Sequence, residues 1–402
     1  MNILFLTLVN FSNIDDRGIY NDLVRVFLRN GHSVDVVCPA EGATTTRLTD
    51  YGNGGRILAV AMGSVQKASI LKKGINTVLL EPKLKYAMNN YLSDKRYDLI
   101  LYSTPPITLA GVVKYIKKRD NAKTYLLLKD IFPQNAVDLG MMSKRGIKAP
   151  IYWYFRRKEK QLYALSDRIG CMSQANVDYV IRHNPEVDPD IVEVCPNSIE
   201  VVDMCIGQEE RDAIRNKYGI PLDKGVFVYG GNLGKPQGIP FLIECLKSQE
   251  QNPDAYFLIV GNGTEFGKLQ AYFDAVQPEN MKLLKSLPKE DYDRMVAACD
   301  VGMIFLDHRF TIPNFPSRLL SYMQAGLPVL ACTDPNTDIG KVIVDGGFGW
   351  WCESDNVHSF EKAVDNIVTT DCNILGERAF KYLQENYEVR QAYQTIQKII
   401  CQ

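Results

Sequence analysis

Hydrophobic residues along the chain fall into short apolar runs that alternate with longer stretches of helical spacing. The first run, Asn2 to Val9, has the buried character of a central parallel strand. Ile19 to Arg29 then has apolar residues at helical spacing, and Asn30-Gly31 closes that helix as a C-cap. Further strands of this half are predicted at 33–38, 57–61, 99–102, 124–128, 168–172 and 191–195. Helices are predicted between them, at 79–92, 108–119 and 173–182.

The second half repeats the alternation after a linker that opens at Cys195-Pro196. Its predicted strands are 226–229, 255–260, 282–287, 301–306 and 329–332. Two helices with no strand after them, 377–386 and 391–401, end the chain. A chain of 402 residues is long enough for two domains. Strand–helix alternation predicts a doubly wound α/β sheet in each, with ligands beyond the carboxyl ends of the strands.

Composition places the chain among ordinary globular proteins, with 46% hydrophobic and 23% charged residues. No apolar run approaches the roughly 20 residues that span a bilayer. The start, MNILFLTLVNFSN, has no basic leader or small-residue cleavage site, so we interpret it as a first strand. Ten cysteines are scattered without a CxxC pair, and the four histidines are far apart in sequence. These features argue against a structural zinc site and suggest reduced thiols in the cytosol.

The near-neutral net charge of −1 hides an asymmetry. Residues 1–196 hold 27 Lys and Arg against 19 Asp and Glu, an excess of eight positive charges. The remainder has an excess of nine negative charges. A basic first half suits a domain that meets an anionic surface or acceptor, although an ordinary solvated surface would give the same count.

The strand at 226–229 ends in the glycine-rich segment Gly230-Gly231-Asn232-Leu233-Gly234-Lys235, which leads into a predicted helix. A strand, a glycine turn and a helix together form an anion cradle, because backbone N–H groups and the positive helix end face one point. Lys235 would add a positive charge and Gln237 a side-chain donor. A glycine-rich turn that binds nothing has the same sequence.

Two more strand ends of the second half have features that favour anions. The strand at 255–260 leads into Gly261-Asn262-Gly263-Thr264-Glu265 and a helix. The strand at 301–306 is followed by a loop and then by Pro316-Ser317-Arg318, where Ser317 is a candidate N-cap. Three such ends in one domain predict a phosphate-binding edge more strongly than one does.

In the first half, Val9 to Gly18, Ser103 to Pro106 and Lys129 to Gln134 lie at predicted strand ends. Asp130 directly follows an apolar strand, where a carboxylate can project toward a ligand. A turn-forming or helix-capping Asp would look the same. Lys129 beside it either keeps that carboxylate ionised or is a surface charge.

The helix predicted at 149–165 carries aromatic residues at 152–155 and the basic run Arg156-Arg157-Lys158. Such a helix can rest on a bilayer, with aromatic rings at the interface and cations near the headgroups. A packed helix with a solvated basic face is the alternative, and the sequence slightly favours it.

In their order and spacing, these segments resemble a GT-B glycosyltransferase of the retaining kind, in glycosyltransferase family 4, over nearly the whole chain. The resemblance is closest to the bacterial surface-polysaccharide branch that includes the L-fucosamine transferases. Its most specific motif is PSRLLSYMQAGLPVLA, from Pro316 to Ala331. The other matching segments are Gly18 to Val37, Lys129 to Gly140, Ile191 to Ile199, Gly231 to Gly238, Leu258 to Glu265 and Ala298 to Val301.

The resemblance implies two Rossmann-like domains that face a cleft, with the last helix crossing back to the first domain. The expected division is 1–196 for the acceptor, 197–385 for the nucleotide sugar and 386–402 for the returning helix. The resemblance assigns donor contacts to Gly231, Asn232, Gly234, Lys235, Gln237, Gly261, Asn262, Gly263, Glu265, Ser286, Leu287, Pro316, Ser317, Arg318 and Leu319. It assigns acceptor contacts to Asn13, Gly18, Lys129 and Asp130, and catalytic roles to Asp130, Lys235 and Arg318.

Two departures from the family pattern concern the donor site. The broader family has two Glu eight residues apart around the 316–328 helix, and Pro313 and Ser321 stand at those positions here. Close relatives lack the first Glu as well, whereas the loss at Ser321 leaves the ribose contact unassigned. Many relatives also have His at the end of the strand before Asp130, where this chain has Lys129.

The expected activity is transfer of a sugar, such as an N-acetylated amino sugar, from a UDP donor to a lipid-diphosphate-linked glycan. We expect no cofactor, metal or nucleic-acid partner, and a cytoplasmic protein peripheral to the inner face of an anionic membrane. Two alternatives keep the fold: a nucleotide-sugar-binding subunit without catalysis, suggested by Pro313 and Ser321, and a UDP-sugar epimerase.

Overall fold

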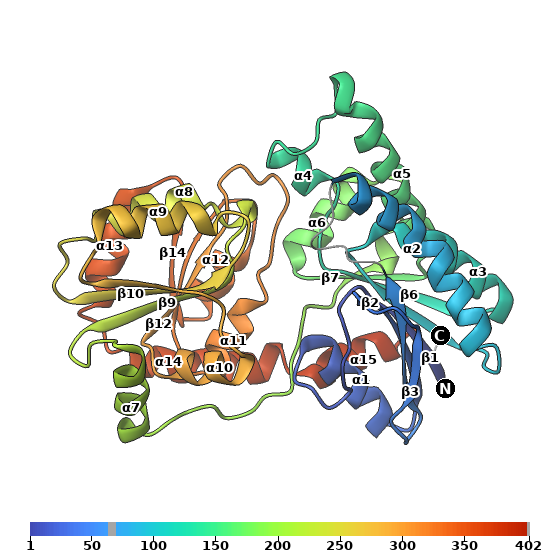
Figure 1. Ribbon diagram of the computed structural model, residues 1–402, viewed down its shortest axis with the longest axis horizontal. Helices are drawn as coiled ribbons and strands as arrows, with labels where there is room; N and C mark the ends of the chain where they lie inside the picture. Colours follow the sequence, from blue (N-terminus) through green and yellow to red (C-terminus); the bar gives the residue numbers. More distant parts are fainter. Residues whose placement is uncertain (63–69, 400–402) are drawn as a thin grey trace. The chain divides into compact units, whose positions relative to one another are not determined.

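The computed structural model describes residues 1–62 and 70–399. The chain divides into two compact units (Figure 1). The first consists of Met1–Glu200 and Val389–Gln402, and the second of Val201–Glu388. The sequence placed the divisions a few residues earlier, after 196 and 385.

The first unit is built on a sheet of eight described strands in the order β3-β4-β2-β1-β5-β6-β7-β8. Every neighbouring pair is parallel except β3 with β4, which pair antiparallel at one edge. The strands are β1 (Asn2–Leu6), β2 (Ser33–Glu41), β3 (Arg47–Asp50), β4 (Gly55–Met62), β5 (Leu99–Ser103), β6 (Lys123–Leu128), β7 (Arg168–Cys171) and β8 (Val192–Val194).

Helices cover both faces of this sheet, so both faces are apolar. On β1, Leu4 and Leu6 belong to one buried cluster, and Ile3 and Phe5 belong to the other, as the two-residue strand period requires. The described helices of five or more residues are α1 (Ile19–Arg29), α2 (Ile70–Tyr91), α3 (Ala110–Asp120), α4 (Gln134–Asp138), α5 (Ala149–Leu165), α6 (Gln174–His183) and α15 (Val389–Gln397).

The last helix, α15, belongs to the first unit, which confirms the predicted return of the chain. Tyr393 packs edge-on against Phe27 of α1, with ring centroids 5.0 Å apart. Its hydroxyl lies 3.1 Å from Nε2 of His32. Val389 and Ile396 are buried in the same cluster. A C-terminal helix therefore completes the apolar core on the α1 face of the first sheet.

The second unit has a sheet of six described strands in the order β11-β10-β9-β12-β13-β14, all parallel. The strands are β9 (Gly225–Asn232), β10 (Ala255–Asn262), β11 (Met281–Leu284), β12 (Val301–Phe305), β13 (Val329–Thr333) and β14 (Gly349–Glu353). Figure 1 shows α8, α9 and α13 over one face, and α10 and α14 over the other. The helices are α7 (Gln208–Tyr218), α8 (Ile239–Ser248), α9 (Phe266–Val276), α10 (Lys289–Ala297), α11 (Arg318–Gln324), α12 (Ile339–Asp345), α13 (Val357–Ile367) and α14 (Cys372–Asn386).

The structure confirms two doubly wound Rossmann-like units, and it corrects several predicted elements. The sequence interpretation missed β3, whose residues RLTD are only partly buried, and β14, which begins with glycine and pairs at the far edge of its sheet. β1 ends at Leu6 instead of Val9. Strand β11 ends at Leu284, so Ser286 and Leu287 lie in the loop after it.

The packing of α15 predicts a stability difference along one helix. Tyr393→Ala should lower the free energy of unfolding by about 3 kcal/mol, because it removes a buried ring from the α1 interface. Gln394→Ala, at an exposed position of the same helix, should change it by less than about 0.5 kcal/mol. Urea unfolding of both variants measures this. Equal stability of the two variants would show that α15 does not contribute to the core.

Candidate functional site

The strand order of the second unit reverses beside β9. From β9 the chain proceeds through β10 to β11 on one side, and through β12 and β13 to β14 on the other. Ligands of open α/β sheets bind beyond the carboxyl ends of strands at such a reversal. The glycine-rich segment noted in the sequence, Gly231 to Gly238, lies there: its first two residues end β9 and the rest leave the strand.

Glycines allow the ends of β9 and β10 to approach each other closely. The two strands stay paired to their last residues, with Gly231 opposite Gly261 and Asn232 opposite Asn262. A Cβ on Gly261 would lie 2.0 Å from the carbonyl oxygen of Gly231. Beyond the strands, Leu233 N–H donates to the Asn262 carbonyl over 2.8 Å, and Glu265 N–H donates to the Leu233 carbonyl over 2.9 Å. The two glycine loops are therefore one hydrogen-bonded unit.

The side chains of the first loop shape its turn. Gln237 Oε1 accepts hydrogen bonds from Gly234 N–H and from Asn232 Nδ2, each over 3.1 Å. The sequence interpretation gave Gln237 the role of a donor to a ligand, whereas in the structure its oxygen holds the loop. Lys235 begins the short 3-10 turn Lys235–Gln237, and its side chain is exposed. The loop therefore keeps one exposed cation beside its backbone.

Arg318, the first residue of α11, reaches back to the start of the glycine loop. Its guanidinium carbon lies 4.3 Å from the ring centroid of Tyr229 on β9. A Cβ on Gly231, where φ is +117°, would lie 3.3 Å from Nη2 of Arg318. Nη1 of Arg318 is buried and has no hydrogen-bond partner among the described residues. A permanently charged, fork-shaped donor is therefore held beside Gly231 with hydrogen-bonding capacity unused.

Two further tyrosines hold this arrangement together. Tyr322, one turn after Arg318 on α11, accepts a hydrogen bond from Gly230 N–H over 3.2 Å and donates to the Met303 carbonyl over 3.1 Å. A Cβ on Gly230 would meet the hydroxyl of Tyr292 at 1.8 Å, so α10 also packs against this strand end. The sequence interpretation missed Tyr229, Tyr292 and Tyr322. The only signal in the sequence is that Tyr322 lies four residues after Arg318.

Other predicted donor residues have different surroundings. Ser317 stands at the predicted N-cap position of α11, but its side chain makes no capping hydrogen bond to that helix. The Leu319 side chain is in the core, and its N–H donates to the Pro316 carbonyl. Glu265 is buried and pairs with Lys268. Asn262 at the end of β10 and Gly263 directly after it are exposed, and Ser286 is exposed after β11.

Loops after β12 and β13 support the same edge. Asp307 N–H donates to the Pro236 carbonyl over 2.9 Å, which links the loop after β12 to the glycine segment. After β13, Asn336 Nδ2 donates to the Phe310 carbonyl over 2.6 Å, and Thr337 Oγ1 donates to the Asn314 carbonyl over 2.5 Å. These bonds fix the chain that leads into Pro316, Ser317 and Arg318.

In the first unit, Asp130 lies directly after β6, as predicted. Both carboxylate oxygens lie 2.8 Å from Nδ2 of Asn135 on α4. Burial raises the pKa of Asp130 to about 6, although the Asn135 hydrogen bond opposes the shift. Asp130 is therefore a partly buried carboxyl group that titrates near the physiological range.

In the described part of the chain, the Lys129 ammonium group makes no hydrogen bond or ion pair with Asp130. Its Nζ donates to the Cys195 carbonyl at the end of β8 over 2.8 Å, and burial lowers the pKa of this lysine. Its backbone N–H donates to Thr104 Oγ1 over 3.0 Å. Lys129 thus joins strand ends inside the protein, and neither the surface-charge interpretation nor direct pairing with Asp130 describes it.

The remaining acceptor residues predicted from the sequence lie in the loop between β1 and α1. The Asn13 side chain accepts from Asp15 N–H over 3.1 Å, and Gly18 precedes α1 and donates its N–H to Asp22 Oδ1 over 3.2 Å. β1 and β6 flank β5 in the sheet. The loop and Asp130 therefore lie at the same edge of the sheet, two strands apart.

Among residues 1–62 and 70–399, no group of three or more His, Cys, Asp or Glu side chains could hold a metal ion. No described helix combines the length and the hydropathy needed to cross a membrane. The nine described cysteines are free thiols, and seven are buried.

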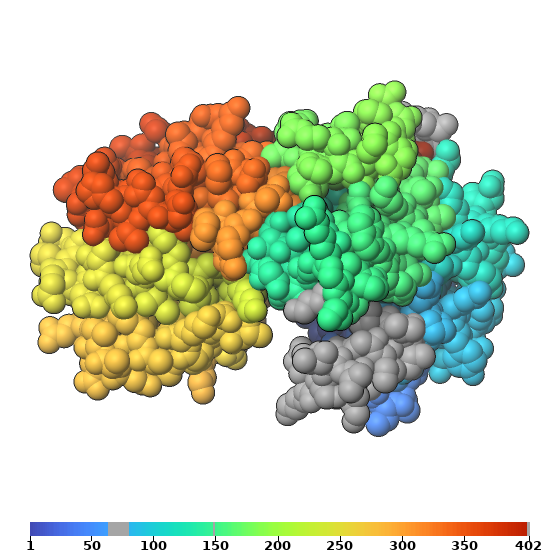
Figure 2. Space-filling model, turned by 90° about the horizontal axis from the view of Figure 1, so that it is seen from above, coloured from blue at the N-terminus to red at the C-terminus, as the bar shows by residue number. Residues whose placement is uncertain are grey.

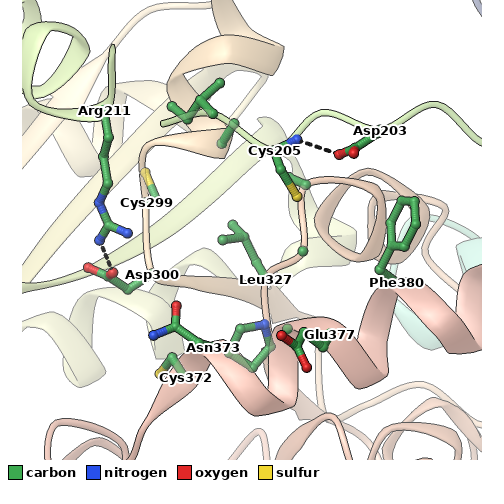
Figure 3. Close-up of a pocket in the computed structure, with 16 residues that line it drawn as sticks. Asp203, Cys205, Arg211, Cys299, Asp300, Leu327, Cys372, Asn373, Glu377 and Phe380 are labelled. Carbon is green, nitrogen blue, oxygen red and sulfur yellow. Dashed lines mark hydrogen bonds and ion pairs between the residues drawn. The ribbon is translucent and has the colours of Figure 1, made fainter. Parts of the chain in front are cut away.

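A separate hollow of about 340 Å³ lies at the amino ends of the strands of the second sheet, next to the residues that precede β12 and β13 (Figure 3). Arg211 points at Asp300 there and pairs with it, so this cation is neutralised. Burial raises the pKa of Cys299 to about 12 and that of Cys372 to about 11, so both thiols stay protonated at neutral pH. The hollow offers neither an unpaired cation nor a thiolate, in contrast to the edge that holds Arg318.

Comparisons with known proteins match both units to glycosyltransferase families. Residues 20–202 match the family model described as Glycosyltransferase Family 4, and residues 210–382 match the one described as Glycosyl transferases group 1. The chain is 25% identical over 295 residues to WbjE of Pseudomonas aeruginosa, named as a probable glycosyltransferase, which covers 73% of this chain and 72% of WbjE. It is 23% identical over 256 residues to WcaI of Escherichia coli (strain K12), named as a colanic acid biosynthesis glycosyl transferase, which covers 61% of this chain and 60% of WcaI.

Among solved structures, the fold matches Anabaena Alr3699/HepE in complex with UDP and glucose, with a TM-score of 0.70. The match covers 100% of this chain and 99% of that one at 14% identity. At this identity the likeness concerns the fold, which is the two-domain GT-B architecture.

Because the two glycine loops lie so close together, adding one methyl group at Gly261 should lower the stability of the protein. Gly261→Ala should destabilise the protein by about 2 kcal/mol or more, because the Cβ overlaps a backbone oxygen that cannot rotate away. Gly267→Ala, in α9, has open space around the new Cβ and should be neutral or stabilising by up to about 1 kcal/mol. Thermal or urea unfolding compares them; an equal effect of both would contradict the close approach of the loops.

The raised pKa of Asp130 predicts a pH dependence. If the ionised carboxylate acts on the acceptor, kcat/KM should fall as the pH drops below about 6, because the group becomes protonated there. Asp130→Asn should lower kcat/KM and remove this acidic limb. The pKa of Asp334 after β13 is also raised to about 6, so Asp334→Asn is the matched control, which should keep the limb. An unchanged limb in Asp130→Asn would exclude Asp130 as its source.

Proposed function

Because this chain is a glycosyltransferase of group 1 type, we propose that it moves a sugar from a UDP-sugar to a lipid-diphosphate-linked glycan, with retention of anomeric configuration. The second unit binds the donor, and the first unit binds the acceptor. The product is an intermediate of a surface polysaccharide such as capsule, O-antigen or exopolysaccharide. The transferred sugar is an N-acetylated amino sugar, as the resemblance to L-fucosamine transferases suggests.

One observation carries the donor assignment: the guanidinium of Arg318 beside Gly231, with Nη1 buried and without a partner among the described residues. A buried donor without an acceptor is costly unless a ligand supplies one. A diphosphate suits this position, since Arg binds phosphate oxygens through paired N–H groups. Gly231 has no side chain to block the approach, and the exposed Lys235 supplies a second cation. The structural match to a protein solved with UDP supports uridine diphosphate as the carrier.

The proposed reaction releases a negatively charged diphosphate, which the cations of the site stabilise. The acceptor hydroxyl oxygen forms a bond to the anomeric carbon as the bond from that carbon to the β-phosphate oxygen breaks. Attack from the face that the phosphate leaves retains the configuration, and the hydroxyl proton passes to the departing phosphate oxygen. Arg318 and Lys235 offset the negative charge that grows on the diphosphate, each by about 3 kcal/mol. Asp130 orients the acceptor or stabilises positive charge on the sugar ring.

A lipid-linked acceptor requires the enzyme to work at a membrane. We propose peripheral association with the inner face of the cell membrane, supported by the excess of basic residues in the first unit's sequence. Within the stretch suggested by the sequence, Tyr152 is buried and Arg156 pairs with Glu159. These two side chains therefore do not contact lipid, and the contact surface must be formed by other residues.

The proposal predicts a difference between two lysines near opposite ends of one helix. Lys235→Ala, just before α8, should lower kcat about 100-fold or more and weaken UDP binding, because a cation beside the leaving diphosphate is lost. Lys247→Ala, at an exposed position in the last turn of α8, should leave both unchanged. Transfer to a synthetic lipid-diphosphate glycan and calorimetry with UDP measure these effects, and the melting temperature should be unchanged in both variants.

The same assays separate the alternatives. The anomeric configuration of the product, read by NMR coupling constants, should match that of the donor; an inverted product would refute the retaining mechanism. UDP binding without transfer from any of a panel of UDP-sugars would favour a non-catalytic subunit. Failure to bind UDP at all would refute the donor assignment.

A further inference from the structure

The segment from the end of α4 to the middle of α5 carries large apolar side chains on the surface of the first unit. Figure 1 shows it standing out from the rest of that unit, and in Figure 2 it faces the viewer. The Ile147 side chain is 99% exposed, and those of Trp153 and Ile151 are 58% and 53% exposed. We define the α4–α5 face by its exposed apolar residues, Met141, Ile147, Ile151, Trp153 and Tyr154.

Helical geometry separates the two sides of α5. Tyr152, Arg156 and Glu159 face inward: Arg156 pairs with Glu159, and its Nη2 donates to Asn184 Oδ1 over 2.6 Å. With 3.6 residues per turn, Trp153 and Tyr154 lie on the other side of the helix, and both are exposed. The ion pair on the inward side sets the rotation of α5 about its axis, and with this rotation the rings of Trp153 and Tyr154 point to the surface.

The charged residues along this stretch of the sequence have one sign. No Asp or Glu occurs between Leu139 and Lys158, whereas this stretch contains six Lys and Arg residues. Lys144, Arg145 and Arg157 are exposed, and none has a carboxylate partner in the described part of the chain. Exposed apolar side chains beside cations without carboxylate partners suit an anionic bilayer. The apolar side chains can insert among the acyl chains, and the cations can bind the anionic headgroups. Trp and Tyr are enriched at that interface.

The α4–α5 face also connects to the candidate acceptor residue. Phe132, two residues after Asp130, packs edge-on against Phe155 of α5, with ring centroids 5.1 Å apart. A hollow of about 210 Å³ lies on the inward side of α5; Ile131 and Pro133 of the same loop and Gln134 of α4 line it, together with Lys144, Tyr152 and Tyr179. The segment that carries the α4–α5 face therefore also contacts the loop that follows Asp130.

We infer that the α4–α5 face is the surface by which this protein docks on a bilayer of anionic phospholipids, with Ile147, Ile151 and Trp153 inserted among the lipids. The inference rests on the proposed function, because a lipid-linked acceptor is delivered from the same bilayer. The hollow beside Lys144 then receives the polar head of the acceptor on its way to Asp130. This assigns a lipid contact to residues 141–154, whereas the sequence suggested 152–158.

Flotation of the full chain with vesicles tests the docking. The protein should float with vesicles of phosphatidylcholine and phosphatidylglycerol at low salt, and much less with phosphatidylcholine alone. Ile147→Asp should weaken the partition into anionic vesicles about tenfold or more, because it removes an inserted side chain and adds a repelled charge. Ile374→Asp, at a 51% exposed position of α14 in the second unit, should float like the wild type. Equal flotation of the two variants would overturn the inference.

Tryptophan emission locates the contact independently. The chain has three Trp residues, of which Trp350 and Trp351 lie in the second unit. Anionic vesicles should shift the emission to shorter wavelength in the wild type, and Trp153→Phe should abolish the shift while the variant still floats. A shift that persists in Trp153→Phe would place the contact elsewhere.

The remaining outcomes separate this inference from the proposed function and from self-association. Normal UDP binding and transfer to a water-soluble acceptor analogue, without flotation, would overturn the docking face and leave the sugar transfer intact. Flotation without UDP binding would support the docking face and overturn the donor assignment. Dimerisation in sedimentation experiments that Ile147→Asp abolishes, without vesicle binding by the wild type, would show that a second copy covers the face and would overturn the lipid assignment.

Discussion

The cation of Arg318, held over the ring of Tyr229 and against Gly231, is the interaction on which the candidate donor site depends. An arginine in that position needs a strand end without side chains, a ring to stack on and a helix that begins at the correct place. Gly230 and Gly231 supply the first, β9 supplies the second, and the bonds of Tyr322 to Gly230 and Met303 fix α11. Gly261 of β10 matters as well, because it lets the end of β10 pair closely with the end of β9 at Gly231.

Each unit uses its strand ends for a different kind of group. The second unit gathers a permanent cation, an exposed lysine and glycine backbone at the reversal of its strand order. The first unit places a carboxyl group after β6, with Asn135 on both of its oxygens and burial raising its pKa to about 6. A cationic edge suits a leaving diphosphate and a carboxyl edge suits a hydroxyl acceptor, which is the division of labour that sugar transfer needs.

Much of this organisation can be predicted from the sequence. Ile19–Arg29 is helical over the predicted residues, since its apolar spacing and its Asn-Gly end are both local signals. Gly231, Gly261 and Arg318 were identified as one phosphate edge because each follows a strand. Partners that come from distant elements leave no such signal: Lys129 bonds to Cys195, Gln237 folds back on Asn232, and three tyrosines surround Arg318. Ser317 has the residue type of an N-cap, but its backbone is already helical. Strand β3 was missed because pairing with β4, not its own composition, makes it a strand.

The proposed donor site requires that a diphosphate take the unused hydrogen-bonding capacity of Arg318. A crystal structure of the protein with UDP measures this directly. A β-phosphate oxygen should lie within hydrogen-bond distance of Nη1 of Arg318 and beside Gly231. UDP bound elsewhere, or bound while Nη1 of Arg318 still lacks a partner, would contradict it.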